Sequence, residues 1–229
     1  MKLGRNIILA ITCALAVCFL ATAFWMRGSI THFVMTDDSL AGLNAAPGGE
    51  GQSLDGLPPG FDFAMLRESS DLVARVGNPR NHTVYDMGVL TEVTVKEVYK
   101  GDQALAGESV YIHEPSSVNP YGQHPSVLVN GGYLFMQEGG EYIVFLTFYE
   151  QPEGYAYTAR DRATYLLTAQ QFGKYPLELN LPETVDYGET AGALTYGEIA
   201  QYSLFTQEKG TVALFQKLYE DVAAHYLAA

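Results

Sequence analysis

Cysteine is almost absent from this chain. Of its 229 residues only two are cysteines, Cys13 and Cys18, and both lie in an apolar N-terminal run. Disulfides, thiol catalysis and cysteine-ligated zinc are therefore excluded from the remainder of the chain. The sequence also lacks a glycine-rich phosphate loop, a nucleophile elbow, a His-Glu-x-x-His pair and a calcium-binding loop. It therefore gives no support to the enzyme classes that these motifs mark.

Basic residues are scarce as well. Thirteen lysines and arginines stand against 26 aspartates and glutamates, which gives a formal net charge of −13. A surface this acidic repels phosphate backbones and anionic lipid headgroups. Nucleic acid is therefore not expected as a partner.

Strand-forming residues, by contrast, are plentiful. The chain is 48% hydrophobic and 12% aromatic, with 16 tyrosines, which is too apolar for a disordered chain and typical of β-structure. The clearest strand covers residues 89–101, where valines alternate with polar residues until Gly101. This alternation predicts a half-buried strand in a mainly β (α+β) fold.

The N-terminal segment, residues 1–27, predicts a transmembrane helix. No charged residue interrupts the run between Arg5 and Arg27, which is long enough to span a bilayer. The basic head favours a signal anchor with a cytoplasmic N-terminus. Two alternatives stay open: cleavage near Ala23, which would release a secreted protein, and lipidation at Cys18. All three place the remaining chain outside the cytoplasm, so we expect an extracytoplasmic protein of the cell membrane.

Three further segments follow the anchor. Residues 28–60 are rich in Gly and Pro and predict a flexible linker. Residues 61–170 predict an antiparallel β-barrel, and residues 171–229 a helical extension packed on it. The expected helices are residues 61–69, a capping box at Thr195 and Glu198, and residues 206–227 with one apolar stripe. The expected strands are residues 71–77, 84–99, 109–114, 133–137 in a hairpin with 141–149, 155–159 and 163–168.

The histidines offer little chemistry. His113, Glu114 and His124 are the only cluster that could suggest a metal or an acid/base pair, but adjacent residues on a strand point to opposite faces. No metal, cofactor or catalytic residue is expected. The long irregular segment 115–132 is the best candidate for function, because such loops often bind ligands. The candidate interaction surface consists of His113, Tyr121, His124 and Tyr133.

The order of these elements resembles a known group of proteins. Residues 71–76, 93–102, 110–112 and 140–146 look like segments of exported, mostly uncharacterised bacterial proteins. These carry a five-stranded barrel similar to the OB-like domain of tissue inhibitors of metalloproteinases, and the resemblance covers residues 70–160. The inhibitors act through an N-terminal cysteine that chelates zinc and are braced by disulfides. This domain has neither, so the resemblance implies an OB-like fold without the inhibitory mechanism.

Three functions remain open at this point. The first is a binding or interaction module of the cell envelope, in which the barrel and the 115–132 segment contact a protein or a glycan. The second is an envelope hydrolase that uses acidic residues, and the third is an accessory subunit of a membrane complex. The sequence favours the first, non-enzymatic role.

Overall fold

The computed structural model describes residues 33–48, 54–85, 88–121, 123–186 and 194–227, together with Phe19 and Thr22. The predicted anchor at residues 1–27 lies outside this part of the chain, apart from Phe19 and Thr22. Within it, no helix has the length and apolar character needed to cross a bilayer. Residues Val34–Ala229 form one compact unit, which is described below.

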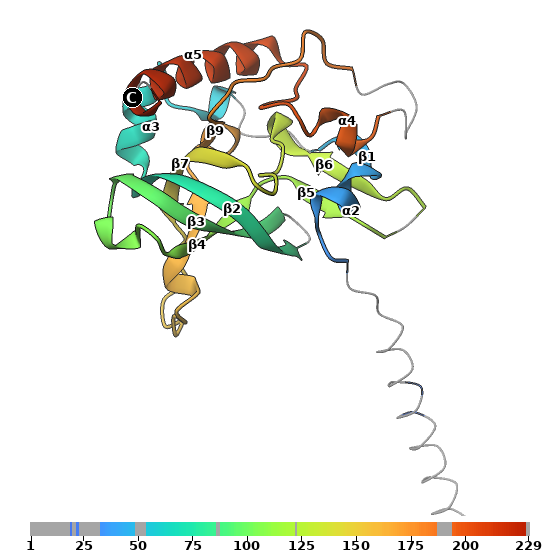
Figure 1. Ribbon diagram of the computed structural model, residues 1–229, viewed down its shortest axis with the longest axis horizontal. Helices are drawn as coiled ribbons and strands as arrows, with labels where there is room; N and C mark the ends of the chain where they lie inside the picture. Colours follow the sequence, from blue (N-terminus) through green and yellow to red (C-terminus); the bar gives the residue numbers. More distant parts are fainter. Residues whose placement is uncertain are drawn as a thin grey trace, which may run out of the picture. The chain divides into compact units, whose positions relative to one another are not determined.

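This unit is mainly β with a few helices, as the sequence predicts (Figure 1). Five strands pair in a closed ring: β2 with β3, β3 with β4, β4 with β8, β8 with β7, and β7 with β2. The β4–β8 pair is parallel and the other four are antiparallel, so the expectation of a wholly antiparallel barrel is wrong at this one pair. The strands of the ring are β2 (Leu72–Tyr85), β3 (Gly88–Lys100), β4 (Ser109–Glu114), β7 (Glu141–Phe148) and β8 (Thr164–Leu167).

The alternation in β3 arises because one face of the strand lines the interior of the ring. Val89, Val93 and Val95 are fully buried, whereas Glu92 is only partly buried and Lys96 is exposed. Side chains on a strand alternate between its two faces. The half-buried strand predicted for residues 89–101 is therefore confirmed.

A second, three-stranded sheet lies beside the ring in the order β1, β6, β5. Its strands are β1 (Asn44–Pro47), β5 (Ser117–Asn119) and β6 (Ser126–Val129), and β1 runs parallel to β6. Helix α2 (Asp37–Ala41), capped by Thr36, precedes β1. The prediction of a flexible linker over residues 28–60 is therefore wrong for residues 36–47, because the β1 backbone forms hydrogen bonds that a composition rich in Gly and Pro does not reveal. The segment 115–132, expected to be irregular, likewise contains two strands.

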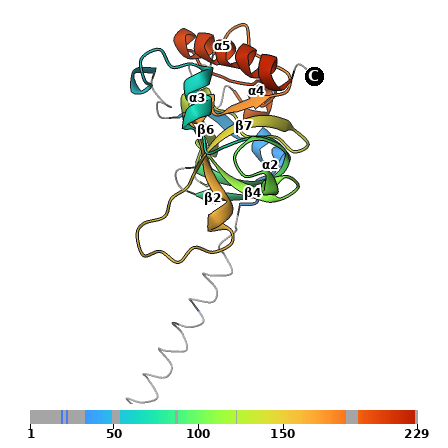
Figure 2. The same cartoon turned by 90° about the vertical axis from the view of Figure 1, so that its left-hand side faces the viewer.

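Two predicted strands are absent from the described chain. Residues 133–137 are irregular, and all of them except the partly exposed Gln137 are buried. Their backbone donates instead to side chains: Met136 N to Glu114 at 2.8 Å and Gln137 N to the Tyr142 hydroxyl at 2.9 Å. Buried backbone groups need partners, and here distant side chains supply them in place of a ladder. Residues 155–159 also form no strand, and lie in the loop between β7 and β8 that extends away from the ring in Figure 2.

Two of the helices, α3 (Phe63–Ser69) and α5 (Lys209–Tyr226), pack on the outer side of β7, whereas α4 (Tyr196–Ile199) contacts α2 and β1. Helix α5 lies beside α3 at the top of Figures 1 and 2. Both confirm predicted helices, and so does α4, which begins with the expected capping box. The C-terminal third is not wholly helical, since β9 (Lys174–Pro176) pairs with β7. The apolar cluster beneath α5 includes Phe63, Leu66, Phe145, Phe172, Tyr175, Phe215, Leu218 and Val222.

Tyr175 in this cluster has an unpaired hydroxyl. The side chain is fully buried, and its oxygen has no hydrogen-bond partner among the described residues. Burying a hydroxyl without a partner costs about 1–3 kcal/mol. Tyr175→Phe should therefore raise the free energy of unfolding by about 1 kcal/mol, measured by urea denaturation. Tyr196→Phe is the matched control, and it should destabilise the fold because the Tyr196 hydroxyl accepts from Phe135 N at 2.7 Å.

Candidate functional site

A cavity of about 370 Å³ opens where the end of β4 meets β8 and the residue that follows β7. It is called the His113 cavity below. His113 lies on the outward face of β4, directly beside Leu166 in the parallel β4–β8 register. The remaining lining residues are Tyr85, Gly88, Glu114, Pro115, Tyr149, Leu167 and Gln170.

Two tyrosines frame the imidazole of His113. Its ring centroid lies 5.0 Å from that of Tyr149 at an interplanar angle of 64°, and 6.1 Å from that of Tyr85 at 43°. Within the described part of the chain, no hydrogen bond reaches either nitrogen of His113. Burial, and to a lesser degree the nearby Arg160 cation, lowers the pKa of His113. At neutral pH the imidazole is therefore uncharged, with one nitrogen able to donate a hydrogen bond and the other able to accept one.

The rim of the cavity carries exposed apolar surface and an unusual turn. Leu166 is 40% exposed and Tyr85 is 47% exposed. On the other side, Ala169 and Gln170 both have positive φ angles, 55° and 48°. Two consecutive non-glycine residues in this region are uncommon, and such strain is found preferentially at binding and catalytic sites. The turn holds Gln170 at the cavity.

Glu114 points away from His113, into the interior of the ring, as expected for neighbours on a strand. Its carboxylate accepts from the Thr91 hydroxyl, from the Tyr133 hydroxyl at 2.7 Å and from Met136 N at 2.8 Å. Thr91 in turn lies 2.9 Å from Nδ1 of His82. The Glu114 carboxylate is therefore fully engaged, and it fixes the end of β4 on which His113 stands.

A buried lysine completes this interior network. The Lys174 ammonium lies 4.1 Å from the ring centroid of Tyr133 and 5.1 Å from that of Tyr142, and it donates to the carbonyl of Leu134. Burial lowers the pKa of Lys174 to about 8, an effect that the Glu114 carboxylate opposes. Tyr133 thus connects an acid and a base, with Glu114 at its hydroxyl and Lys174 over its ring.

No protein-family model matches this chain, and no curated protein matches it either.

Only one of the four predicted interaction residues lies at the cavity. His113 does, whereas Tyr121 and His124 are exposed in the segment between β5 and β6 and do not line it. The placement of Tyr133 on a surface is wrong, since its side chain is 1% exposed and its hydroxyl is bonded to Glu114. Among the described residues, no group of three or more His, Cys, Asp or Glu side chains could hold a metal ion.

Sequence reasoning missed most of the cavity. Tyr85, Tyr149, Leu166 and Gln170 lie far from His113 along the chain and carry no motif. The sequence carries no signal that Leu166 belongs to a cavity, because the strand Thr164–Leu167 is apolar at its last three positions and only the fold shows that Leu166 faces solvent.

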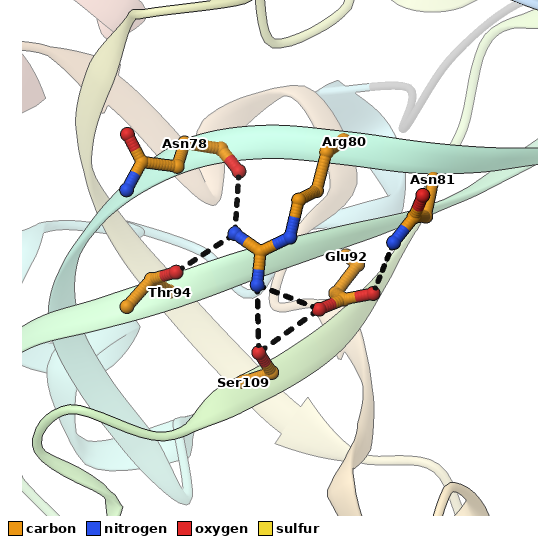
Figure 3. Close-up of polar contacts among 6 residues, drawn as sticks. All are labelled: Asn78, Arg80, Asn81, Glu92, Thr94 and Ser109. Atoms are coloured by element: carbon orange, nitrogen blue, oxygen red, sulfur yellow. Dashed lines mark hydrogen bonds and ion pairs between the residues drawn. The ribbon is translucent and has the colours of Figure 1, made fainter.

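A second polar cluster lies on the outer face of the ring, centred on Arg80 (Figure 3). The Arg80 guanidinium donates to Glu92 at 2.7 Å, to Thr94 at 2.9 Å and to Ser109 at 3.0 Å. Glu92 also accepts from Asn81 at 2.8 Å, and this hydrogen bond is the largest of the effects that lower the pKa of Glu92.

This cluster serves the fold. The β2–β3 register shifts on both sides of Arg80, between Gly77 and Arg80 and between Arg80 and Thr83. Asn78 and Asn81, which flank Arg80, have positive φ angles of 53° and 51°. Side chains from β3 and β4 satisfy the guanidinium and thereby hold the irregular middle of β2 against the sheet. The cluster is a clamp rather than a ligand site.

Proposed function

We propose that this protein is a binding module of the cell envelope and that the His113 cavity is its ligand site. The observation that carries the proposal is a concave, largely apolar cavity lined by aromatic rings, with an imidazole whose nitrogens form no hydrogen bond to a described residue. Ligand sites are typically apolar hollows with a few placed polar groups. Ala169 and Gln170 at its rim have positive φ angles, and backbone strain of this kind is found preferentially at functional sites.

Hydrolysis by acidic residues has less support. A general base has to present its carboxylate to the substrate. Glu114, the acid among the lining residues, holds its carboxylate in three hydrogen bonds inside the ring. Binding is therefore the function that the cavity supports best.

The proposed fold of the module is an OB-like barrel. The closed order β2, β3, β4, β8, β7, with a parallel pair between β4 and β8, supports it, because OB-folds are five-stranded Greek-key barrels. The resemblance of residues 70–160 to exported bacterial proteins supports it as well.

The proposed location is the outer side of the cell membrane, with residues 1–27 as the anchor. The uncharged run between Arg5 and Arg27 supports this assignment. Protease added to intact cells, or to spheroplasts if an outer layer blocks access, should remove an epitope tag placed after Ala229. A tag that is protected until the cytoplasmic membrane is lysed would contradict this location.

A photo-crosslinker at the cavity rim tests the binding function. Leu166→benzoylphenylalanine places the probe at the mouth of the cavity, and irradiation of native envelopes should give a discrete covalent adduct. The same probe at Glu97, which is exposed on β3 and does not line the cavity, is the control. The adduct should disappear when His113→Ala is added. Equal yields at positions 166 and 97, or no adduct at all, would refute the binding function.

A further inference from the structure

We infer that the His113 cavity binds an aromatic side chain of a polypeptide whose flanking residues are basic. This inference rests on the proposed function, since it identifies the ligand of the same site. It is carried by the size of the cavity, the polarity of its lining, the inclination of its rings and the charge of the chain.

The size of the cavity limits the ligand to one compact group. Small-molecule sites usually measure about 300–1,000 Å³, and the volume here, about 370 Å³, is near the lower end of that range. It accommodates one ring-bearing side chain with the adjoining backbone. A glycan chain would have to bind mainly outside it.

The lining discriminates against a sugar ring. A saccharide carries hydroxyls around its circumference, and each hydroxyl left unpaired on burial costs about 1–3 kcal/mol. Pro115, Leu166 and Leu167 offer no hydrogen bond from their side chains, and the Glu114 carboxylate is already engaged. The polar side chains that remain belong to four residues, His113, Gln170, Tyr85 and Tyr149, which is fewer than the hydroxyls and ring oxygen of a buried saccharide require. An aromatic ring has no such requirement. The imidazole of His113 and the amide of Gln170 are sufficient for the one or two peptide groups beside it.

The inclined rings provide the contacts that an aromatic guest prefers. Tyr149 and Tyr85 stand at 64° and 43° to His113, at centroid distances of 5.0 and 6.1 Å. They therefore form a concave wall rather than a flat platform. Aromatic rings pair favourably edge-to-face or offset at 4.5–7 Å, and each such pair contributes about 0.5–1.5 kcal/mol beyond area burial. The ring of an inserted aromatic side chain would be the fourth ring in this arrangement and would contact the other three in the same way.

The net charge of the chain favours a ligand with basic residues on either side of the inserted ring. The chain carries a net charge of −13, and the long-range field of the whole chain attracts and orients a cationic partner even though the Arg160 cation lies near His113. Leu166 and Tyr85 supply exposed apolar rim for the residues next to the inserted ring. The partner that fits is therefore a segment with lysine or arginine on either side of a phenylalanine, tyrosine or tryptophan.

Histidine NMR of the full chain in detergent micelles provides the test. With ¹³C-labelled histidine, His113 can be assigned by its loss in His113→Ala. Titration with N-acetylphenylalaninamide should shift the His113 resonance saturably, and N-acetylglucosamine should not. The peptide acetyl-Lys-Phe-Lys-amide should bind at least about threefold more tightly than the blocked phenylalanine at low salt, and this advantage should vanish at 1 M salt. Leu166→Ala should weaken peptide binding about fivefold, whereas the matched exposed-site variant His124→Ala should leave it unchanged.

Each contrary outcome has a distinct meaning. A saturable shift of His113 with N-acetylglucosamine and none with the aromatic amide would overturn the aromatic ligand but leave the cavity as the binding site. No salt-dependent advantage for the lysine-flanked peptide would overturn the basic flanks. No shift with any probe would also overturn the inference, and the crosslinking experiment at position 166 then decides separately whether the cavity binds anything.

Discussion

Glu114→Ala should lower the free energy of unfolding by about 3–5 kcal/mol. The side chain is 1% exposed and accepts from Thr91, Tyr133 and Met136 N. Truncation leaves two buried donors, the Tyr133 hydroxyl and Met136 N, without an acceptor, and each unsatisfied group costs about 1–3 kcal/mol. The Thr91 hydroxyl still has Nδ1 of His82 at 2.9 Å. It also removes the carboxylate whose charge favours the protonated form of the buried Lys174. The shift in urea midpoint at constant m-value measures the loss.

Glu108→Ala is the matched control for this prediction. Glu108 is also a glutamate close to β4, but its side chain is exposed, so its removal should change stability by no more than about 0.5 kcal/mol. Glu114→Gln should fall between the two, because the amide nitrogen brings a donor to a place where all three partners are donors. If the two alanine variants unfold at the same urea concentration, the interior network contributes nothing to stability.

Raising the pH from 8 to 10 should stabilise the fold by about 2 kcal/mol through Lys174, since one pKa unit corresponds to about 1.36 kcal/mol. The pKa of Lys174 is lowered to about 8 in the folded protein from an ordinary value of 10.5. Between these two values the unfolded chain holds the proton that the folded chain has released. The unfolded state therefore binds more protons, and stability rises with pH.

The increase in the free energy of unfolding should end near pH 10, because above this pH the titration of tyrosines destabilises the fold. Burial raises the pKa of Tyr142 to about 12, and it raises the pKa of Tyr133 well above its ordinary value. Above pH 10 the unfolded chain loses phenolic protons that the folded chain retains, so stability falls. Urea denaturation at half-unit pH steps should show this maximum. Lys174→Met should remove the rise between pH 8 and 10, and the exposed-site control Lys217→Met should retain it; if all three proteins give the same curve, Lys174 is not the group responsible.

Local patterns in the sequence identify most of the elements. The alternation in residues 89–101 gives β3, the apolar run 142–148 gives the buried strand β7, and the stripe ending at Tyr226 gives α5. In each of these elements the pattern reflects the burial of one face or of both. Burial by a nearby sheet leaves such a periodic trace whatever the partner is.

Pairing between strands that are far apart along the chain leaves no periodic pattern in the sequence. Nothing in residues 44–47 indicates that they pair with residues 126–129, because the pairing uses backbone groups that every residue carries. Residues 133–137 show the opposite failure: their apolar pattern predicts a strand, but Glu114 and Tyr142 take the hydrogen bonds that a neighbouring strand would have taken.

The residues of the His113 cavity include one that a local sequence pattern identifies and several that only distant pairing brings together. His113 stands out in the sequence because it lies beside Glu114 and near His124, and its orientation opposite to Glu114 follows from the strand period. Its partners come from the end of β2, the end of β7, β8 and the turn at Ala169. Their convergence depends on closure of the ring, which is a property of the whole fold.

The parallel pairing of β1 with β6 also determines where this domain can be cut. β6 is the middle strand of its sheet, and β1 covers one of its two edges. A shortened protein that began at Phe61 would lack β1 and expose that edge as a row of unpaired backbone groups. Such rows recruit strands from other molecules. The self-contained unit therefore begins before Asn44, and we expect the segment that contains β1 to protect the fold against aggregation.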